Sequence, residues 1–196
     1  MCSATMIVTP RTSLGFTLVE LMTVMAVAAI LMVIGIPQLE DFMADQHVRT
    51  VTSDLAADIA LARVKAVEAA HRAHIQMTPG PNWTNGWRVY VDLNDSDGYV
   101  ANVNGFAEQV KEFDGVSGTM RICTNVNDFA TDVIFRPDGR VVRTIPPSPT
   151  DGIYVIDDMG RGNSAHTKIR GIVFELDGRA HVENLNPDNL VIVLPC

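Results

Sequence analysis

The pattern of apolar and polar positions divides the chain into three parts, and the first part is almost entirely apolar. Residues 16–36 contain a single charged residue, Glu20. A helix of this length rises about 30 Å, which matches the hydrocarbon core of a bilayer. We therefore predict a helix over 16–36 that crosses a membrane.

The second part, residues 37–75, has the spacing of an amphipathic helix. Apolar residues recur every three or four positions and charged residues take the other side; the apolar set is Leu55, Ile59, Ala62, Ala66 and Ala70, and the charged set includes Asp54, Asp58, Lys65 and Arg72. The order of charges predicts surface ion pairs of Asp54 and Asp58 with Arg63 and Lys65. Pro37 lacks an N–H group, so we expect it to kink the long helix rather than end it.

The third part, residues 76–196, consists of short alternating runs separated by turn residues, which is typical of β-strands. The predicted strands are 86–92, 120–123, 132–136, 141–145, 153–156, 169–175, 179–183 and 190–194. Two similar segments contain the turns Asp138-Gly139 and Asp177-Gly178, and an Asp-Gly pair between apolar runs predicts a hairpin. The chain is therefore predicted to be an α+β protein, with a long N-terminal helix packed on an antiparallel β-sheet head.

Composition and charge narrow the functional classes. The chain has 196 residues, 47% of them hydrophobic, which excludes a disordered chain and allows one folded domain beside the membrane segment. Its net charge of −8 does not favour nucleic acid or an anionic lipid surface as a partner. The sequence has no motif of a serine hydrolase, a zinc protease, a P-loop or a dinucleotide site. We expect no enzymatic activity and no cofactor.

The flanks of the apolar part distinguish it from an ordinary secretory signal. Such a signal has a shorter apolar region with a small-residue cleavage site after it, whereas here Gly15 precedes the apolar run. Arg11 lies before the span and acidic residues lie after it, so the positive-inside rule places the N-terminus in the cytoplasm. A carboxylate costs about 2.5–3.5 kcal/mol at the centre of a membrane, so Glu20 either has a function there or reaches the headgroups from near the end of the span.

The segment Gly15-Phe16-Thr17-Leu18-Val19-Glu20-Leu21, followed by the long apolar run, resembles the class III signal of type IV pilins and type II secretion pseudopilins. The resemblance implies that a prepilin peptidase removes the leader 1–15 and that the new Phe16 amine is N-methylated. It also implies that Glu20 pairs with the Phe16 amine of a neighbouring subunit during assembly. Such a pair gains strength as the effective permittivity falls.

The rest of the chain resembles the GspH/FimT family of minor pilins and pseudopilins. The residues that carry this resemblance are Ala62-Arg63, Gly86-Trp87-Arg88-Val89-Tyr90 and the terminal cysteine. This implies a structural subunit that primes or caps a type IV pilus or a type II secretion pseudopilus. Its partners would be the other major and minor pilins or pseudopilins, the prepilin peptidase and the bacterial inner membrane. The head would lie in the periplasm, and the subunit could be extracted from the membrane into the filament.

An alternative function implied by the same resemblance is DNA uptake during natural transformation. Where a FimT-like member carries Gly-Arg-x-Arg, this chain has Gly178-Arg179-Ala180-His181. The candidate contacts to DNA are Arg179, His181, Arg140 and Arg143. Because His181 is neutral where the family has an arginine, we expect weak, salt-sensitive binding to phosphates.

Two cysteines remain after removal of the leader, which contains Cys2. In an oxidising periplasm Cys123 and Cys196 are expected to form a disulfide, the alternative being two free thiols. The acidic turn 92–98 is interpreted as a solvated hairpin turn rather than a calcium site, because its glycine is one position late for an EF-hand loop. His71 and His74 are expected to lie on the surface at the end of the helix, and no metal site is predicted.

Overall fold

The structure is a computed structural model. It describes residues 15–78, 82–96, 98–101, 103, 108–116, 118–143, 151–157, 159, 167–175 and 177–185. The chain forms two compact units, Met1–Glu40 and Asp41–Cys196, referred to below as the N-terminal and the C-terminal unit.

A single helix, α1 (Leu18–Ala69, 52 residues), begins in the N-terminal unit and ends in the C-terminal unit. The helix continues through Pro37, which therefore does not end it, as predicted. The prediction that helix continues to residue 75 is wrong. Ala70 has φ +55°, a left-handed conformation typical of the position after a helix, and the chain then enters a strand.

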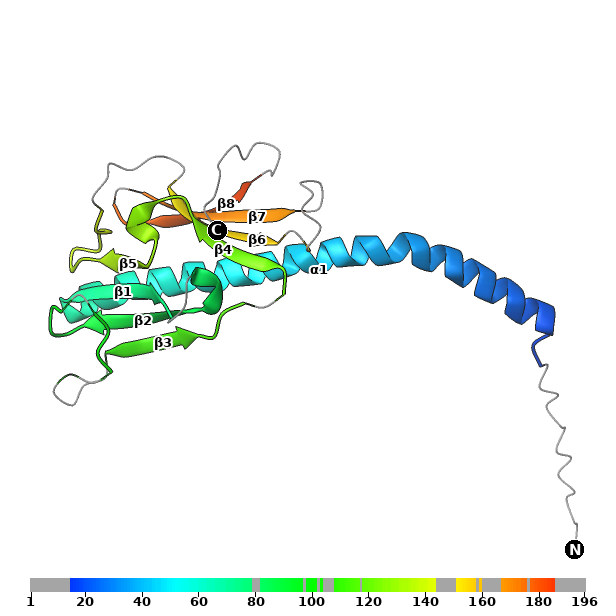
Figure 1. Ribbon diagram of the computed structural model, residues 1–196, viewed down its shortest axis with the longest axis horizontal. Coiled ribbons are helices and arrows are strands. Elements are labelled where there is room, and N and C mark those ends of the chain that lie inside the picture. Colours follow the sequence, from blue (N-terminus) through cyan, green and yellow to red (C-terminus); the bar gives the residue numbers. More distant parts are fainter. Residues whose placement is uncertain are drawn as a thin grey trace, which may run out of the picture. The chain divides into compact units, whose positions relative to one another are not determined.

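The described residues of the head form two four-stranded antiparallel sheets rather than one, and Figure 1 shows the two sheets. The first sheet has the order β3-β2-β1-β5, with β1 Arg72–Met77, β2 Trp87–Asp92, β3 Gln109–Phe113 and β5 Asp132–Phe135. The second has the order β4-β6-β7-β8, with β4 Met120–Thr124, β6 Gly152–Asp157, β7 Lys168–Phe174 and β8 Ala180–Leu185. Short 3₁₀ turns, η1 (Trp83–Asn85) and η2 (Asn127–Phe129), precede β2 and β5.

Six of the predicted strands correspond to β2, β4, β5, β6, β7 and β8. In the predicted strand 141–145, Val141 forms an isolated bridge with Phe135, and residues 144–145 lie outside the described residues. The predicted strand 190–194 also lies outside them. The sequence pattern does not predict β1, most of which falls in the predicted helix 37–75, or β3, an edge strand with three exposed residues among its five. Both strands form because β2 pairs with them on either side, and this pairing overrides local propensity.

One hydrophobic core joins the C-terminal half of α1 to both sheets. The helix contributes the predicted apolar face, with Leu55, Ile59, Ala62 and Ala66 fully buried. Trp87 and Phe135 are among the contributions of the first sheet, and Ile153 and Ile172 of the second. Figure 1 shows this part of the helix, in cyan, running along both sheets. Each large apolar side chain buried in this way stabilises the fold by about 1.5–3 kcal/mol.

Asp58 lies inside this core and not on the helix surface, so the predicted surface pairing of Asp58 is wrong. Its carboxylate accepts a hydrogen bond from the Trp87 indole N–H (2.9 Å) and forms an ion pair with Lys111 Nζ (2.6 Å). The side chain of Asp58 is 3% exposed, whereas that of Lys111 is 45% exposed. One carboxylate thereby connects α1 to β2 and β3. Lys65 instead pairs with Glu68 one turn further along the helix.

Replacing Asp58 by alanine is expected to destabilise the C-terminal unit by about 2 kcal/mol, because the buried Trp87 N–H loses its acceptor while Lys111 can return to water. The measurement is urea unfolding of the detergent-solubilised chain, followed by tryptophan fluorescence. Glu68→Ala is the matched control, since it removes an exposed helix pair expected to be worth at most about 0.5 kcal/mol. If the two variants unfold at the same urea concentration, the structural role assigned to Asp58 is wrong.

Candidate assembly site

The Gly15–Phe16 peptide bond lies in a non-helical segment just before α1. The Phe16 side chain is 83% exposed, and no heavy atom would lie within 4 Å of a methyl group placed on Gly15. A peptidase needs an uncovered backbone outside a helix at the bond that it cuts. The described residues around this bond are non-helical and exposed.

Thr17 caps the helix that follows, a feature that the sequence analysis missed. The N–H of Glu20 donates to Thr17 Oγ1 (3.2 Å), and the N–H of Leu21 donates to the Thr17 carbonyl (3.2 Å). Thr17-Leu18-Val19-Glu20 matches the capping-box pattern, which was the signal available in the sequence. A carboxylate in the first turn also complements the positive end of the helix dipole. Glu20 therefore has a local role within one chain, in addition to any role between chains.

The residues of α1 in the N-terminal unit present apolar side chains on all sides. Most of the large apolar side chains between Leu18 and Leu39 are more than half exposed. By length and composition, α1 is long and apolar enough to cross a membrane. A helix that is apolar all round requires lipid or other apolar helices around it.

Arg63 joins the two Asp-Gly turns to the helix. Its Nε donates to the Gly139 carbonyl (3.0 Å) and its Nη2 to the Asp177 carbonyl (3.2 Å). Both turns have a glycine with positive φ, +78° at Gly139 and +81° at Gly178. The two turns are in direct contact, because a methyl group on Gly178 would overlap the Gly139 carbonyl. The near-repeat in the sequence therefore corresponds to two similar hairpins that meet on one arginine.

Three of the four candidate DNA contacts lie at these two hairpins. Arg179 is exposed and forms an ion pair with Asp177 (2.6 Å); the backbone N–H and the guanidinium of Arg179 lower the pKa of the Asp177 carboxyl. His181 Nδ1 lies 3.5 Å from Glu175 Oε1. Arg140 is exposed, and its backbone N–H donates to Asp138 Oδ1 (3.0 Å). A carboxylate thus offsets the charge of Arg179, and a second carboxylate lies beside His181.

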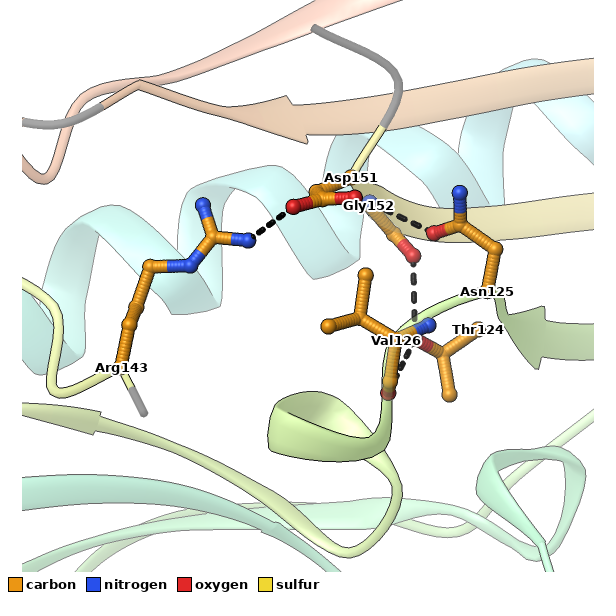
Figure 2. A network of polar contacts seen from close by, with 6 residues as sticks. All are labelled: Thr124, Asn125, Val126, Arg143, Asp151 and Gly152. Carbon is orange, nitrogen blue, oxygen red and sulfur yellow. Dashed lines mark hydrogen bonds and ion pairs between the residues drawn. The ribbon is translucent and has the colours of Figure 1, made fainter. Parts of the chain in front are cut away.

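The side chain of Arg143, the fourth candidate, is buried. Figure 2 shows its guanidinium beside the carboxylate of Asp151. The Arg143 side chain is 8% exposed, its guanidinium forms an ion pair with Asp151, and it lies 5.1 Å from the centre of the Phe129 ring. The start of β6 is fixed nearby, because Gly152 N–H donates to Asn125 Oδ1 (3.0 Å) and Thr124 Oγ1 donates to the Gly152 carbonyl (3.1 Å). Arg143 therefore stabilises the fold and does not reach a ligand at the surface.

Cys123 lies near the end of β4, buried against Tyr154, Ile156 and Ile169 on the neighbouring strands. Its sulfur is bonded as half of a disulfide. Cys196 lies outside the described residues, so the identity of the partner stays a prediction. Burial is the main cause of a pKa of about 12 for the Tyr154 hydroxyl in the same cluster.

The acidic turn after β2 uses its side chains for local hydrogen bonds. The Ser96 N–H donates to Asp92 Oδ1 (3.1 Å) and Asn94 Oδ1 (3.0 Å), while the Glu108 carboxylate accepts the N–H groups of Leu93 and Val100. No group of three His, Cys, Asp or Glu side chains in the described part of the chain is arranged to hold a metal ion. His74 is fully buried in β1 rather than on the surface, stacked on Tyr90 and 3.2 Å from Asp132.

Comparison with known proteins identifies the family. Residues 51–182, from α1 into β8, match the family model described as type II transport protein GspH. The chain belongs to the GspH family. Residues 10–36 match the prokaryotic N-terminal methylation motif, which includes Gly15, Phe16 and Glu20. No curated protein matches the chain significantly.

Solved structures similar to this GspH-family chain include a type IV minor pilin and a minor pseudopilin. One is the type IV minor pilin FimU of Pseudomonas aeruginosa, 18% identical over 69% of this chain and 91% of that chain, with a TM-score of 0.47. The other is the minor pseudopilin EpsH of the type 2 secretion system of Vibrio cholerae, 7% identical over 71% and 97%, with a TM-score of 0.44. The predicted family and the predicted α+β fold are confirmed. The chain is a minor pilin or pseudopilin, of a type IV pilus or a type II secretion system.

The contact between the two hairpins of this GspH-family chain can be tested with Gly178→Ala. The variant is expected to lose at least about 3 kcal/mol of unfolding free energy, since it combines a left-handed backbone with an overlap on the Gly139 carbonyl. Gly118→Ala is the matched control, because Gly118 has nearly the same φ (+83°) but open space around it. That control is expected to lose only about 1 kcal/mol.

Thermal unfolding of both variants, measured by circular dichroism, gives the comparison. If Gly178→Ala and Gly118→Ala melt at the same temperature, the hairpins do not support each other in the way described.

Proposed function

We propose that this GspH-family subunit primes or caps a short periplasmic filament after a prepilin peptidase cuts between Gly15 and Phe16. The observation that carries the proposal is the exposed, non-helical Gly15–Phe16 bond placed two residues before the capped start of an apolar helix. Cleavage there leaves a chain of 181 residues whose N-terminal Phe16 is the substrate of N-methylation.

The proposed location is the bacterial inner membrane, crossed once, with the N-terminus in the cytoplasm and the C-terminal unit in the periplasm. The charges on either side of the apolar segment support this orientation, Arg11 before it and Glu40 and Asp41 after it. From the membrane the subunit passes into the pilus or pseudopilus. The proposed partners are other pilins or pseudopilins and the prepilin peptidase.

Glu20 is proposed to pair with the Phe16 amine of a neighbouring subunit. In this chain Glu20 uses its backbone N–H for the Thr17 cap, and its side chain is exposed. The carboxylate is therefore available to a second chain without loss of the Thr17 cap. An unpaired charge in the membrane is costly, so such a pair would also fix the register between subunits.

The proposed role is structural and not enzymatic. The DNA-uptake alternative is not part of the proposal, because Arg143 is buried in an ion pair and Arg179 and His181 each lie beside a carboxylate. Binding to nucleic acid requires several unpaired cations along one surface.

The variants Glu20→Ala and Glu20→Gln are expected to insert in the membrane and to be cleaved after Gly15, but to fail to enter filaments. Insertion persists because both changes remove a charge from the membrane. Cleavage persists because the Gly15–Phe16 bond stays exposed, and the Thr17 cap does not use the Glu20 side chain. The readouts are mass spectrometry of the membrane-extracted chain and co-purification with the major pilin or pseudopilin.

Thr17→Ser, which keeps a capping hydroxyl and the Glu20 charge, is the control and is expected to assemble. A mature N-terminus at any residue other than Phe16 would refute the proposed processing. Normal assembly of Glu20→Gln would refute the charge pair alone.

We further propose that Cys123 and Cys196 are joined and that the bond stabilises the C-terminal unit. The bond would close a loop with 72 residues between the two cysteines. Closing such a loop lowers the chain entropy of the unfolded state, which stabilises the fold by about 4 kcal/mol. Cys123→Ser and Cys196→Ser are therefore each expected to lower the melting temperature by many degrees, and the double variant no further than either single variant. Two free thiols per unfolded, unreduced mature chain would rule the bond out.

A further inference from the structure

The second sheet buries apolar side chains on both of its faces, and only one face belongs to the core that contains α1. Ile153 and Val155 of β6 and Ile172 of β7 pack into that core. Successive residues of a strand point to opposite faces. The residues between them therefore lie on the face turned away from the core, called here the outer face. A separate cluster of buried residues on the outer face consists of Cys123, Tyr154, Ile156 and Ile169.

Two rows of residues cross the outer face. In the first row Cys123 of β4 lies opposite Tyr154 of β6, which lies opposite Gly171 of β7. A methyl group on Gly171 would come within 2.9 Å of the Tyr154 ring, so the ring occupies the space above this glycine. The second row, on β6, β7 and β8, consists of Ile156, Ile169 and Leu185. Together the two rows form an apolar surface that extends from β4 to β8.

This surface is buried although α1 lies on the other side of the sheet. Tyr154 is 1% exposed, Ile156 is 6% exposed and Ile169 is 9% exposed. Among the described residues, the members of the cluster and the partly buried Leu185 packed against it all come from the second sheet itself. A sheet face becomes this inaccessible only where another segment packs on it. A segment outside the described residues must therefore cover the outer face.

Residues 186–196 follow β8, lie outside the described residues and have the composition that this surface requires. Asn186-Pro187-Asp188-Asn189 consists of turn-forming residues, and residues 190–194 are five consecutive apolar residues. The segments 144–150 and 160–166 also lie outside the described residues, but they contain one branched aliphatic residue between them, Ile145. The apolar run 190–194 is thus the better match for an apolar sheet face.

The bonded sulfur of Cys123 indicates the direction in which this segment runs. Cys123 lies on the outer face, on the strand at the opposite edge of the sheet from β8 (Figure 1). Its sulfur is half of a disulfide, and Cys196 is its proposed partner. The order β4-β6-β7-β8 separates the two edges by three strand spacings, about 14 Å. Residues 186–196 span up to about 36 Å when extended, so they are long enough to cross the sheet.

Pairing of residues 190–194 with the edge of β8 does not fit the same bond. It would leave Cys196 four strand spacings from β4, about 19 Å. The Cα atoms of a disulfide lie about 4.4–6.8 Å apart. A path over the outer face meets this requirement, because Cys123 points to that face.

We infer that residues 186–196 form a strap that crosses the outer face of the second sheet from β8 to β4 and is fixed at its far end by the bond of Cys196 to Cys123. Residues 190–194 cover Tyr154, Ile156 and Ile169. The inference rests on the proposed Cys123–Cys196 bond and goes beyond it, since it assigns the partner of a whole sheet face. Exposed apolar surfaces of this kind promote association with other chains. The strap therefore makes the outer face unavailable to neighbouring subunits.

The test places photoreactive p-benzoylphenylalanine at Val191, and in a second variant at Ile192, in the full-length oxidised chain in detergent. Successive side chains of an extended segment point in opposite directions, so one of the two positions faces the sheet. After irradiation and digestion, mass spectrometry is expected to find cross-links from that position to peptides that contain Tyr154, Ile156 or Ile169. The same photoreactive residue at Val110, on the edge strand β3 of the first sheet, is the control and is expected to give no such cross-link.

A second measurement does not depend on the label. Each of residues 190–194 is replaced in turn by aspartate, and the melting temperature of the full-length chain is measured. An aspartate that faces the outer face places a charge against apolar side chains, so the melting temperature is expected to fall at alternate positions. Asn189→Asp adds the same charge just before the apolar run and is expected to leave the melting temperature unchanged.

Cross-links to β8 alone, or no cross-links from either position, would overturn the strap, and so would equal melting temperatures for the five aspartate variants. Thiol titration separates this result from the proposed bond. A bonded Cys123 without cross-links to the outer face would count against the strap alone. Two free thiols with these cross-links present would support the covering of the face and overturn its attachment at Cys123. Processing at Phe16 is judged by the mature N-terminus and is independent of both results.

Discussion

The structure depends on one helix that must satisfy two environments. In α1 the residues up to Leu39 are apolar on all sides, whereas those after Asp41 bury one apolar face in the core of the C-terminal unit. The first pattern suits lipid or neighbouring apolar helices, and the second suits packing against sheets. One continuous helix therefore supplies both the segment that is long and apolar enough to cross a membrane and the face on which the sheets pack.

The C-terminal unit is organised around polar residues of this helix as well as its apolar face. Asp58 reaches β2 and β3 of the first sheet. Arg63, five residues later, binds the turn after β5 and the turn between β7 and β8, so it joins both sheets. A buried carboxylate and a half-buried guanidinium thus fix where each sheet lies on the helix. Apolar packing alone is less directional, because it depends on area and not on orientation.

The arginines of the C-terminal unit are held by contacts of different kinds. Arg63 donates to the backbone carbonyls of Gly139 and Asp177, and the guanidinium of Arg143 pairs with Asp151. Arg179 pairs with Asp177, two residues before it in the same turn. The pair at Arg179 therefore follows from local sequence, whereas Arg63 meets its two acceptors only through the tertiary fold.

The sequence by itself determined the features that depend on local order. These are the apolar length of the first segment, the Gly15–Phe16–Glu20 motif, the apolar face of α1 and the two Asp-Gly turns, all of which follow from the spacing of neighbouring residues. Tertiary structure alone decided the features that depend on pairing between distant segments. Residues 72–77 have the composition of a helix end, yet they form β1 because β2 and β5 supply hydrogen bonds on both sides. The burial of Asp58, His74 and Arg143 likewise depends on packing between distant segments, and no spacing along the chain encodes which strands lie side by side.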